Sequence, residues 1–141
     1  RFAEDEARSM GRTARGVHGV DLEGDDAVVG LVAAEPDDDA SLLTVTRNGY
    51  GKRTSLSEYR RQSRYGKGLR DIGTGERNGA AVAIERVTGE ESLVAMSERG
   101  QIMRTNVDEV SEQGRNTQGV IVMRTDEGDR VATVETFVTE E

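Results

Sequence analysis

A repeat with a period of 51–52 residues runs through this chain of 141 residues. The pattern Arg-x-x-x-Gly-aliphatic begins at Arg12, recurs at Arg64 and recurs again at Arg115. The same register holds for three acidic residues, Glu6, Glu58 and Glu109. A period of this length is typical of proteins built from similar units that stack on one another. The repeat predicts one partial unit over residues 1–40 and two fuller units over residues 41–91 and 92–141.

Each unit is predicted to consist of β-strands. Residues 42–46 are rich in β-formers, and Asn48-Gly49 then supplies a hairpin signal, as Arg99-Gly100 does one unit later. Further strands are expected over 68–72, 80–87, 119–124 and 131–138, and no segment keeps a 3.6-residue apolar period. Four strands in about 50 residues predict an all-β fold of antiparallel, propeller-like blades. A solenoid of stacked strands is the structural alternative.

The composition indicates a protein adapted to high salt. The net charge is −8, aromatic residues make up 4% of the chain, and only Lys52 and Lys67 of the 19 basic residues are lysine. An acidic surface keeps a protein hydrated and soluble where salt is abundant. An acidic protein from a mesophile is the alternative interpretation.

One segment reverses this charge. Residues 47–70 contain eight basic residues and only one acidic residue, Glu58, so the segment carries +7 while the remainder carries −15. A basic segment in an acidic protein favours an anionic partner such as nucleic acid. The alternative is that the arginines pair with carboxylates of neighbouring units. Tyr50, Tyr59 and Tyr65 interleave with the basic residues, and we expect them to pack rather than to stack on bases.

Several classes of function find no support in the residues. The chain contains no cysteine and a single histidine, His18, so we expect no metal site, no cofactor and no catalytic triad. The longest apolar stretches, 31–34 and 120–123, are too short to span a bilayer, and no apolar leader follows Arg1. The expectation is a non-catalytic protein of a reducing cytoplasm, without a membrane partner.

Four motifs together carry a family resemblance. They are Asn-Gly-Tyr-Gly-Lys-Arg-Thr at 48–54, Glu-Tyr at 58–59, Glu-Arg-Asn-Gly at 76–79 and Gly-Arg-Asn-Thr-Gln-Gly-Val at 114–120. In this order they resemble the last units of the C-terminal DNA-wrapping domain of DNA gyrase A. The resemblance implies a β-pinwheel, in which propeller-like blades exchange strands and duplex DNA wraps around a basic rim. It also implies a non-catalytic part of an ATP-dependent type II topoisomerase, with the rest of gyrase A and with gyrase B as partners.

One motif of that family is only partly present. Residues 62–68 read Gln-Ser-Arg-Tyr-Gly-Lys-Gly, which resembles the family's signature box Gln-Arg-Arg-Gly-Gly-Lys-Gly but departs from it at Ser63 and Tyr65. The box belongs to the first blade of the family's domain. We therefore expect that the full determinant of negative supercoiling lies outside this sequence.

The predicted function is binding, bending and wrapping of duplex DNA without sequence preference. Its expected phosphate contacts are basic residues of the repeat and of the basic segment: Arg12, Arg15, Lys52, Arg53, Arg60, Arg61, Arg64, Lys67, Arg70, Arg104 and Arg115. Those from Lys52 to Arg70 are expected to form one exposed face, away from the solvated acidic loop Asp37–Asp39. Two alternatives are a DNA-geometry-sensing domain like the C-terminal domain of topoisomerase IV, and a propeller-like protein-interaction platform.

Overall fold

The computed structural model describes residues 1–140, and its regular structure is almost entirely β. By its internal contacts the chain divides into two compact units. The small unit comprises Arg1–Val28 and Tyr59–Leu69, and the sheet unit comprises Val29–Glu58 and the chain from Arg70 onward. Within residues 1–140, no helix is long and apolar enough to cross a membrane.

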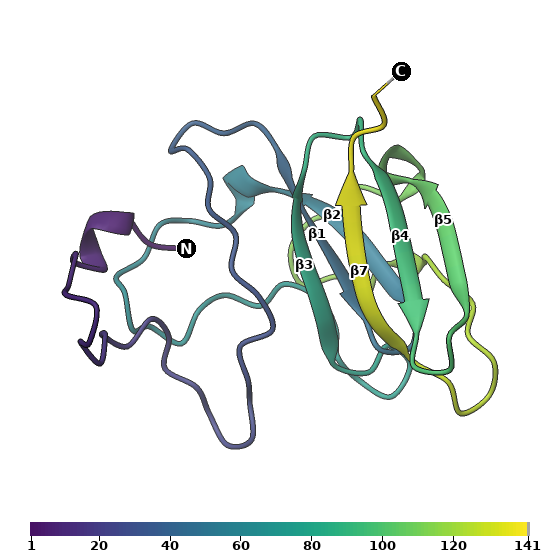
Figure 1. Cartoon of the computed structure of the whole chain (residues 1–141), viewed down its shortest axis with the longest axis horizontal. Helices are drawn as coiled ribbons and strands as arrows, with labels where there is room; N and C mark the ends of the chain where they lie inside the picture. Colours follow the sequence, from purple (N-terminus) through teal and green to yellow (C-terminus); the bar gives the residue numbers. More distant parts are fainter. Residues whose placement is uncertain (141) are drawn as a thin grey trace. The chain divides into compact units, whose positions relative to one another are not determined.

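The first sheet of the sheet unit is an antiparallel sheet of four strands (Figure 1). β1 (Ser41–Thr46) and β2 (Tyr50–Ser55) form a hairpin, and β3 (Ala81–Val87) pairs with the other side of β1. The short strand β6 (Val120–Ile121) completes the order β3-β1-β2-β6. Because β6 comes from the following repeat, the two repeats are joined by an exchanged strand.

The second sheet repeats this plan with three strands. β4 (Ser92–Ser97) pairs with β5 (Ile102–Asn106) and with β7 (Val131–Phe137) in the order β5-β4-β7. Thr44 faces Lys52 in the first hairpin and Ala95 faces Met103 in the second, so the two hairpins have the same register 51 residues apart. In the part of the chain described, no strand pairs with the outer edge of β5.

The core of the sheet unit lies between the inward faces of the two sheets. Leu43 and Val45 of β1, Val87 of β3 and Leu93 of β4 are 0–1% exposed. Val107, Val110, Met123, Val131 and Val134 complete the buried cluster. Burying each side chain of this size contributes about 1.5–3 kcal/mol, so this cluster supplies most of the drive for the two sheets to pack.

Both predicted hairpins are confirmed, and each turn ends in a glycine with positive φ. Gly49 and Gly100 both have φ of +87°, a region that side-chain-bearing residues avoid. Gly49 is further constrained, because a Cβ there would lie 1.9 Å from the carbonyl oxygen of Met123. A Cβ at Gly100 would meet no atom within 4 Å. The turn of the first hairpin is therefore packed against the backbone at Met123, whereas the turn of the second hairpin has no such close neighbour.

Three short 3-10 turns follow the same repeat. They are η1 (Glu4–Glu6), η2 (Leu56–Glu58) and η3 (Val107–Glu109), and each ends at the acidic residue of the repeat. The sequence does not predict them, because a turn of three residues is too short to show a helical period. They place the acidic residues Glu6, Glu58 and Glu109 at equivalent points of successive repeats.

Two predicted strands need correction. Residues 68–72 form no strand, and only Ile72 makes an isolated bridge, to Thr117. The strand expected over 119–124 is reduced to Val120–Ile121. Val120 and Ile121 pair with Gly51 and Tyr50, whereas no described strand pairs with residues 68–72. Without a partner strand, the backbone N–H and C=O groups of a segment have no inter-strand hydrogen bonds, so the segment does not form a regular strand.

The small unit contains no sheet among its described residues. A parallel bridge joins Val20 to Gly66, and the Asp21 N–H donates to the Gly66 carbonyl over 3.0 Å. Tyr65, with φ of +63°, stacks on His18 with 4.6 Å between the ring centres. These polar and aromatic contacts, rather than a buried apolar cluster, hold segments 1–28 and 59–69 together.

Candidate nucleic-acid interface

Arg64 is a structural residue of the small unit. Its backbone N–H donates to the Glu6 carboxylate over 3.0 Å, and its Nε–H donates to the Glu6 carbonyl over 2.8 Å. A third hydrogen bond runs from Nη1 to the carbonyl of His18. The guanidinium therefore holds η1 and the His18 region against segment 59–69. Its charge is directed at protein oxygens, which leaves it poorly placed to neutralise a phosphate.

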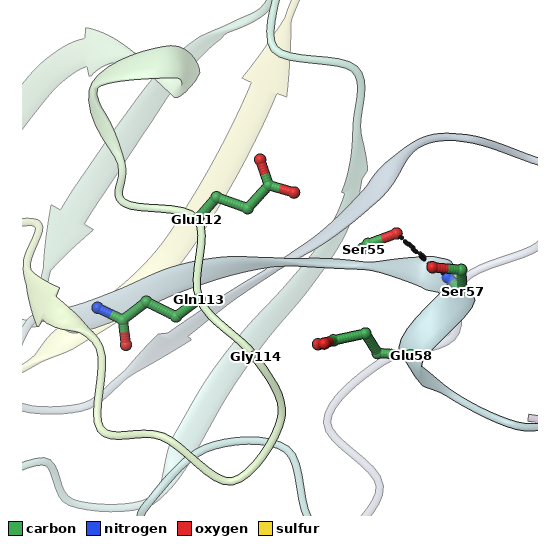
Figure 2. A pocket seen from close by; sticks show the side chains of 6 residues that line it. All are labelled: Ser55, Ser57, Glu58, Glu112, Gln113 and Gly114. Carbon is green, nitrogen blue, oxygen red and sulfur yellow. Dashed lines mark hydrogen bonds between the residues drawn. The ribbon is translucent and has the colours of Figure 1, made fainter.

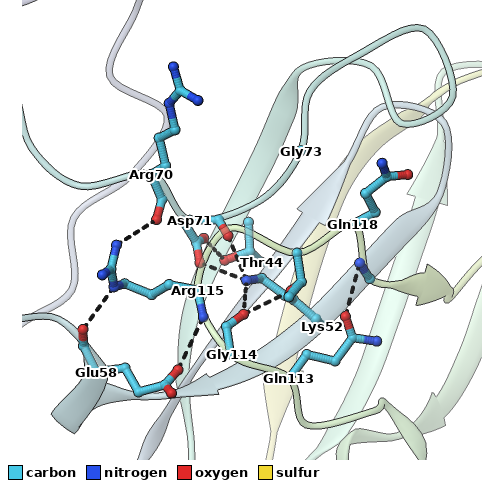
Figure 3. Close-up of polar contacts among 12 residues, drawn as sticks. Thr44, Lys52, Glu58, Arg70, Asp71, Gly73, Gln113, Gly114, Arg115 and Gln118 are labelled. Carbon is cyan, nitrogen blue, oxygen red and sulfur yellow. Dashed lines mark hydrogen bonds and ion pairs between the residues drawn. The ribbon is translucent and has the colours of Figure 1, made fainter.

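Arg115 forms the same set of contacts in the sheet unit (Figure 3). Its N–H donates to the Glu58 carboxylate over 3.1 Å, and its Nε–H donates to the Glu58 carbonyl over 2.9 Å. Its Nη1 donates to the Arg70 carbonyl over 3.2 Å. The predicted equivalence of Arg64 and Arg115 is confirmed by these contacts. Arg12 forms no hydrogen bond or ion pair with any of the residues 1–140, so its role stays a prediction.

Lys52 is buried, and its expected exposure on the basic face is wrong. Its side chain is 0% exposed and donates to the carbonyls of Asp71, over 2.6 Å, and Gly114, over 2.7 Å. The Asp71 carboxylate lies 3.4 Å from Nζ and also accepts from Thr44 Oγ1 over 2.6 Å (Figure 3). Lys52 points inward because side chains alternate between the two faces of β2. Its hydrogen bonds and ion pair offset the cost of burying the side chain. It connects β2 to the segments around Asp71 and Gly114.

Arg53 and Arg104 also have protein partners. Arg53 Nε donates to the Val110 carbonyl over 2.7 Å, and its Nη2 donates to the Asp108 carbonyl over 3.2 Å. Arg104 is exposed, donates to Ser92 and Thr139, and lies over the ring of Phe137 at 5.1 Å. Arg53 is half-buried. Of this pair, Arg104 retains more access to an external anion.

The remaining predicted contacts are exposed. Arg12, Arg15, Arg60 and Arg61 belong to the small unit, and no side-chain hydrogen bond or ion pair links any of them to another described residue. Lys67 is exposed in the same unit but forms an ion pair with Glu23. Arg70 of the sheet unit is exposed, and only its backbone carbonyl is engaged, by Arg115. Side chains of this kind are available to bind phosphates.

Charge is distributed unevenly between the units. The small unit contains eight basic and seven acidic residues, and its segment Tyr59–Leu69 has four basic and no acidic residues. The sheet unit contains 11 basic and 20 acidic residues. An anionic ligand is therefore less strongly repelled by the small unit. Of the residues expected to form a single basic face from Lys52 to Arg70, Lys52 is buried, and the other members belong to both units.

The acidic loop is only partly solvated. Asp38 accepts two hydrogen bonds from Arg86 of β3, with Nε at 2.6 Å and Nη2 at 2.8 Å, and one from the Ala40 N–H. The hydrogen bonds from Arg86, followed by that from Ala40, hold the pKa of Asp38 below its ordinary value. The side chain of Asp38 is 6% exposed, whereas Asp37 and Asp39 face solvent. The loop is thus fastened to β3 at Asp38 alone.

A hollow in the sheet unit does not suit an anion. It has a volume of about 350 Å³ and is lined by Ser55, Ser57, Glu58, Glu112, Gln113 and Gly114 (Figure 2). Two carboxylates line it and no basic side chain does, so it repels phosphate. Within residues 1–140, no three His, Cys, Asp or Glu side chains are grouped to hold a metal ion.

A family model and the sequences of known proteins indicate the same family. The model of the family described as "DNA gyrase C-terminal domain, beta-propeller" matches residues 1–35, 40–88 and 91–137. The chain is 55% identical over 136 residues to the DNA gyrase A protein of the halophile Haloquadratum walsbyi, covering 96% of this chain and 16% of that protein. It is 47% identical to the DNA gyrase A protein of Staphylococcus epidermidis, covering 95% of this chain and 15% of that protein. The halophilic relative agrees with the acidic, lysine-poor composition.

Solved structures show the same fold. The "Structure of DNA gyrase A C-terminal domain" superposes with a TM-score of 0.87 at 28% identity, over 97% of this chain and 46% of that chain. The C-terminal domain of DNA topoisomerase IV superposes with a TM-score of 0.82 at 24% identity, over 96% of this chain and 42% of that one. The sequence thus spans about one sixth of its curated relatives and under half of the solved domain. The chain belongs to the DNA gyrase C-terminal domain family and has its all-β, propeller-like fold.

Proposed function

We propose that this chain is a duplex-binding module of a type II topoisomerase, and that it bends and wraps DNA without reading its sequence. It acts together with the remainder of gyrase A and with gyrase B, which supply the ATP-dependent strand passage. The chain itself performs no covalent step. The observation that carries the proposal is the set of exposed arginines without protein partners, Arg12, Arg15, Arg60 and Arg61, in a member of the gyrase family.

Most of the basic residues predicted to contact DNA fall into two groups, those that bond to protein carbonyls and those that are exposed without a protein partner in the described chain. Arg64, Arg115, Arg53 and Lys52 bond to carbonyls of neighbouring segments and hold the repeats together. Arg60 and Arg61 come from the stretch of the small unit that lacks acidic residues. Contacts of this kind to phosphates carry no base identity, so binding by Arg60 and Arg61 is expected to be independent of sequence. Bending is then stabilised by the additional contacts that a curved duplex makes.

The test is a binding measurement with fluorescently labelled duplexes of unrelated sequence. The double variant Arg60→Ala/Arg61→Ala is expected to lose about tenfold or more in affinity, to a similar extent for every duplex. Arg124→Ala/Arg130→Ala is the matched control, because both side chains are exposed in the sheet unit, outside the predicted contacts. Equal affinity of the Arg60/Arg61 variant and the native chain would refute these contacts. A loss confined to one duplex sequence would refute phosphate recognition.

A further inference from the structure

The backbone of Arg70 is held by the segment around Arg115 (Figure 3). Arg115 Nη1 donates to the Arg70 carbonyl over 3.2 Å. The Asn116 N–H donates to the carbonyl of the next residue, Asp71, over 2.7 Å. Arg115 is itself anchored, because its Nε–H donates to the carbonyl of Glu58 over 2.9 Å. All of these residues belong to the sheet unit, so hydrogen bonds fix the backbone at Arg70 relative to η2.

The side chain of Arg70 is exposed and leads away from this network (Figure 3). Its guanidinium forms no hydrogen bond or ion pair with any of the residues 1–140. The carboxylates of the network are occupied by other groups. That of Glu58 accepts from the Arg115 N–H over 3.1 Å, and that of Asp71 lies 3.4 Å from Nζ of the buried Lys52. The guanidinium of Arg70 therefore keeps all its donors for an external anion.

The fold does not require an arginine at position 70. In the small unit, Arg64 Nη1 donates to the carbonyl of His18, which holds the same place in the repeat as Arg70. In the following repeat this place is taken by Ile121. The contact with the bonding arginine uses only the backbone carbonyl, which every residue has. Because a histidine and an isoleucine also occur at this place, the charge of Arg70 serves a purpose other than joining the repeats.

We propose that Arg70 contacts a phosphate of duplex DNA and that Arg115 is a positioning residue for this contact. These roles rest on the proposed function, because they require that the chain bind duplex DNA. A guanidinium presents its donors in a planar fork that matches two oxygens of one phosphate. A fixed backbone at Arg70 lowers the entropy that the side chain loses when it binds. Arg115 spends its Nε and Nη1 on carbonyls and acts on the ligand through Arg70.

Two substitutions of Arg115 separate positioning from direct contact with DNA. Arg115→Lys keeps the charge but loses the fork that reaches two carbonyls, whereas Arg115→Ala loses both. If Arg115 positions Arg70, both variants should bind duplex DNA about two- to tenfold more weakly, with the salt slope nearly unchanged. A phosphate contact of Arg115 itself would give native affinity in Arg115→Lys and a slope less steep by about 0.9 in Arg115→Ala. That result would overturn the positioning role.

A double-mutant cycle tests whether Arg115 acts through Arg70. Arg70→Ala changes an exposed side chain and should leave the fold intact. It should weaken duplex binding about tenfold and make the salt slope less steep by about 0.9. Arg115→Ala should cause no further loss of affinity in the Arg70→Ala background, because the residue that it positions is gone. Losses that add in the double variant would overturn the proposal.

Lys52→Met is the control for a general loss of stability. It removes a buried partner of Asp71 but leaves the hydrogen bond from Arg115 to the Arg70 carbonyl. Below the unfolding transition, its affinity for duplex DNA should equal that of the native chain, and a loss as large as that of Arg115→Ala would contradict positioning. A native chain that binds duplex DNA while Arg70→Ala binds equally well would overturn this contact alone. A native chain that binds no duplex DNA would overturn the proposed function as well.

Discussion

Arg64 and Arg115 lie 51 residues apart and form the same three hydrogen bonds, to a glutamate carboxylate, to the carbonyl of that glutamate and to a second carbonyl 12 residues after it. Each arginine joins one repeat to the preceding one. The contacts use both the shape of the guanidinium and its charge, since two of its nitrogens donate to two different carbonyls. The repeat in the sequence is therefore also a repeat of polar contacts, which explains why the arginine itself recurs.

The first prediction concerns Arg115. Arg115→Ala should lower the free energy of unfolding by about 2 kcal/mol, because the carbonyls of Glu58 and Arg70 lose charged donors. Arg124→Ala is the control and should change it by less than about 0.5 kcal/mol, since its exposed side chain has no partner in the described chain. Urea denaturation of the two variants measures the difference. Equal stability of the two variants would show that the contacts of Arg115 with Glu58 and Arg70 do not stabilise the fold.

Lys52 gives a prediction that separates folding from DNA binding. Lys52→Met introduces the residue found at the equivalent position of the next repeat, Met103, and should cost about 3 kcal/mol because Asp71 and the Gly114 carbonyl lose a buried partner. DNA affinity per folded molecule should stay unchanged, since the ammonium is 0% exposed. Thermal denaturation and DNA titration below the transition measure the two effects. A variant of native stability that binds DNA weakly would mean that Lys52 reaches the ligand.

The two hairpin glycines provide a matched pair. Gly49 and Gly100 share φ of +87°, so an alanine at either position strains the backbone by about 1–2 kcal/mol. Only at Gly49 does a Cβ also meet a backbone oxygen, at 1.9 Å. Gly49→Ala should therefore destabilise the chain by at least about 2 kcal/mol more than Gly100→Ala. Chemical denaturation measures the free energy of unfolding of both variants. Equal losses of stability would show that the Met123 contact is not present in solution.

Glu85 gives a prediction about pH. Burial on β3, followed by repulsion from Glu135, raises the pKa of Glu85. A carboxyl whose pKa is raised on folding stabilises the folded state at low pH and loses that contribution as pH rises through its folded pKa. Glu85→Gln should therefore raise the melting temperature at pH 7, and the gain should vanish below about pH 4. Asp38→Asn is the opposite control, because the pKa of Asp38 is lowered and its stabilising effect is lost in acid. A gain for Glu85→Gln that persists at pH 3 would contradict the assignment.

The sequence predicts those features that depend on nearby residues. The hairpins at Asn48-Gly49 and Arg99-Gly100 and the strands around 42–46, 80–87 and 131–138 follow from local patterns and from the repeat. The absence of a strand over 68–72 does not follow, because strand formation depends on a partner that the local pattern cannot reveal. The boundaries of the three repeats stay a prediction.

The candidate interface was harder to predict than the fold. Lysine and arginine are usually exposed, so the charge count assigns Lys52 and Arg64 to a surface. Their partners lie far away in the sequence: Lys52 bonds to Asp71 and Gly114, which are 19 and 62 residues away. A signal was nonetheless present, since Glu6 and Glu58 share the period of the arginines that they bind. When acidic and basic residues recur with the same spacing, they indicate ion pairs and hydrogen bonds between repeats rather than an unpaired basic face.

The central claim is that exposed arginines bind the phosphates of duplex DNA, and salt tests it most directly. Each phosphate contact releases condensed counterions, so the logarithm of affinity should fall with the logarithm of salt by about 0.9 per contact. We expect about four to six contacts, and so a slope between about −3.5 and −5.5 from about 0.1 M to 1 M monovalent salt. Arg60→Ala/Arg61→Ala should reduce the steepness by about two. An affinity for DNA that stays flat or rises across this range would contradict the account.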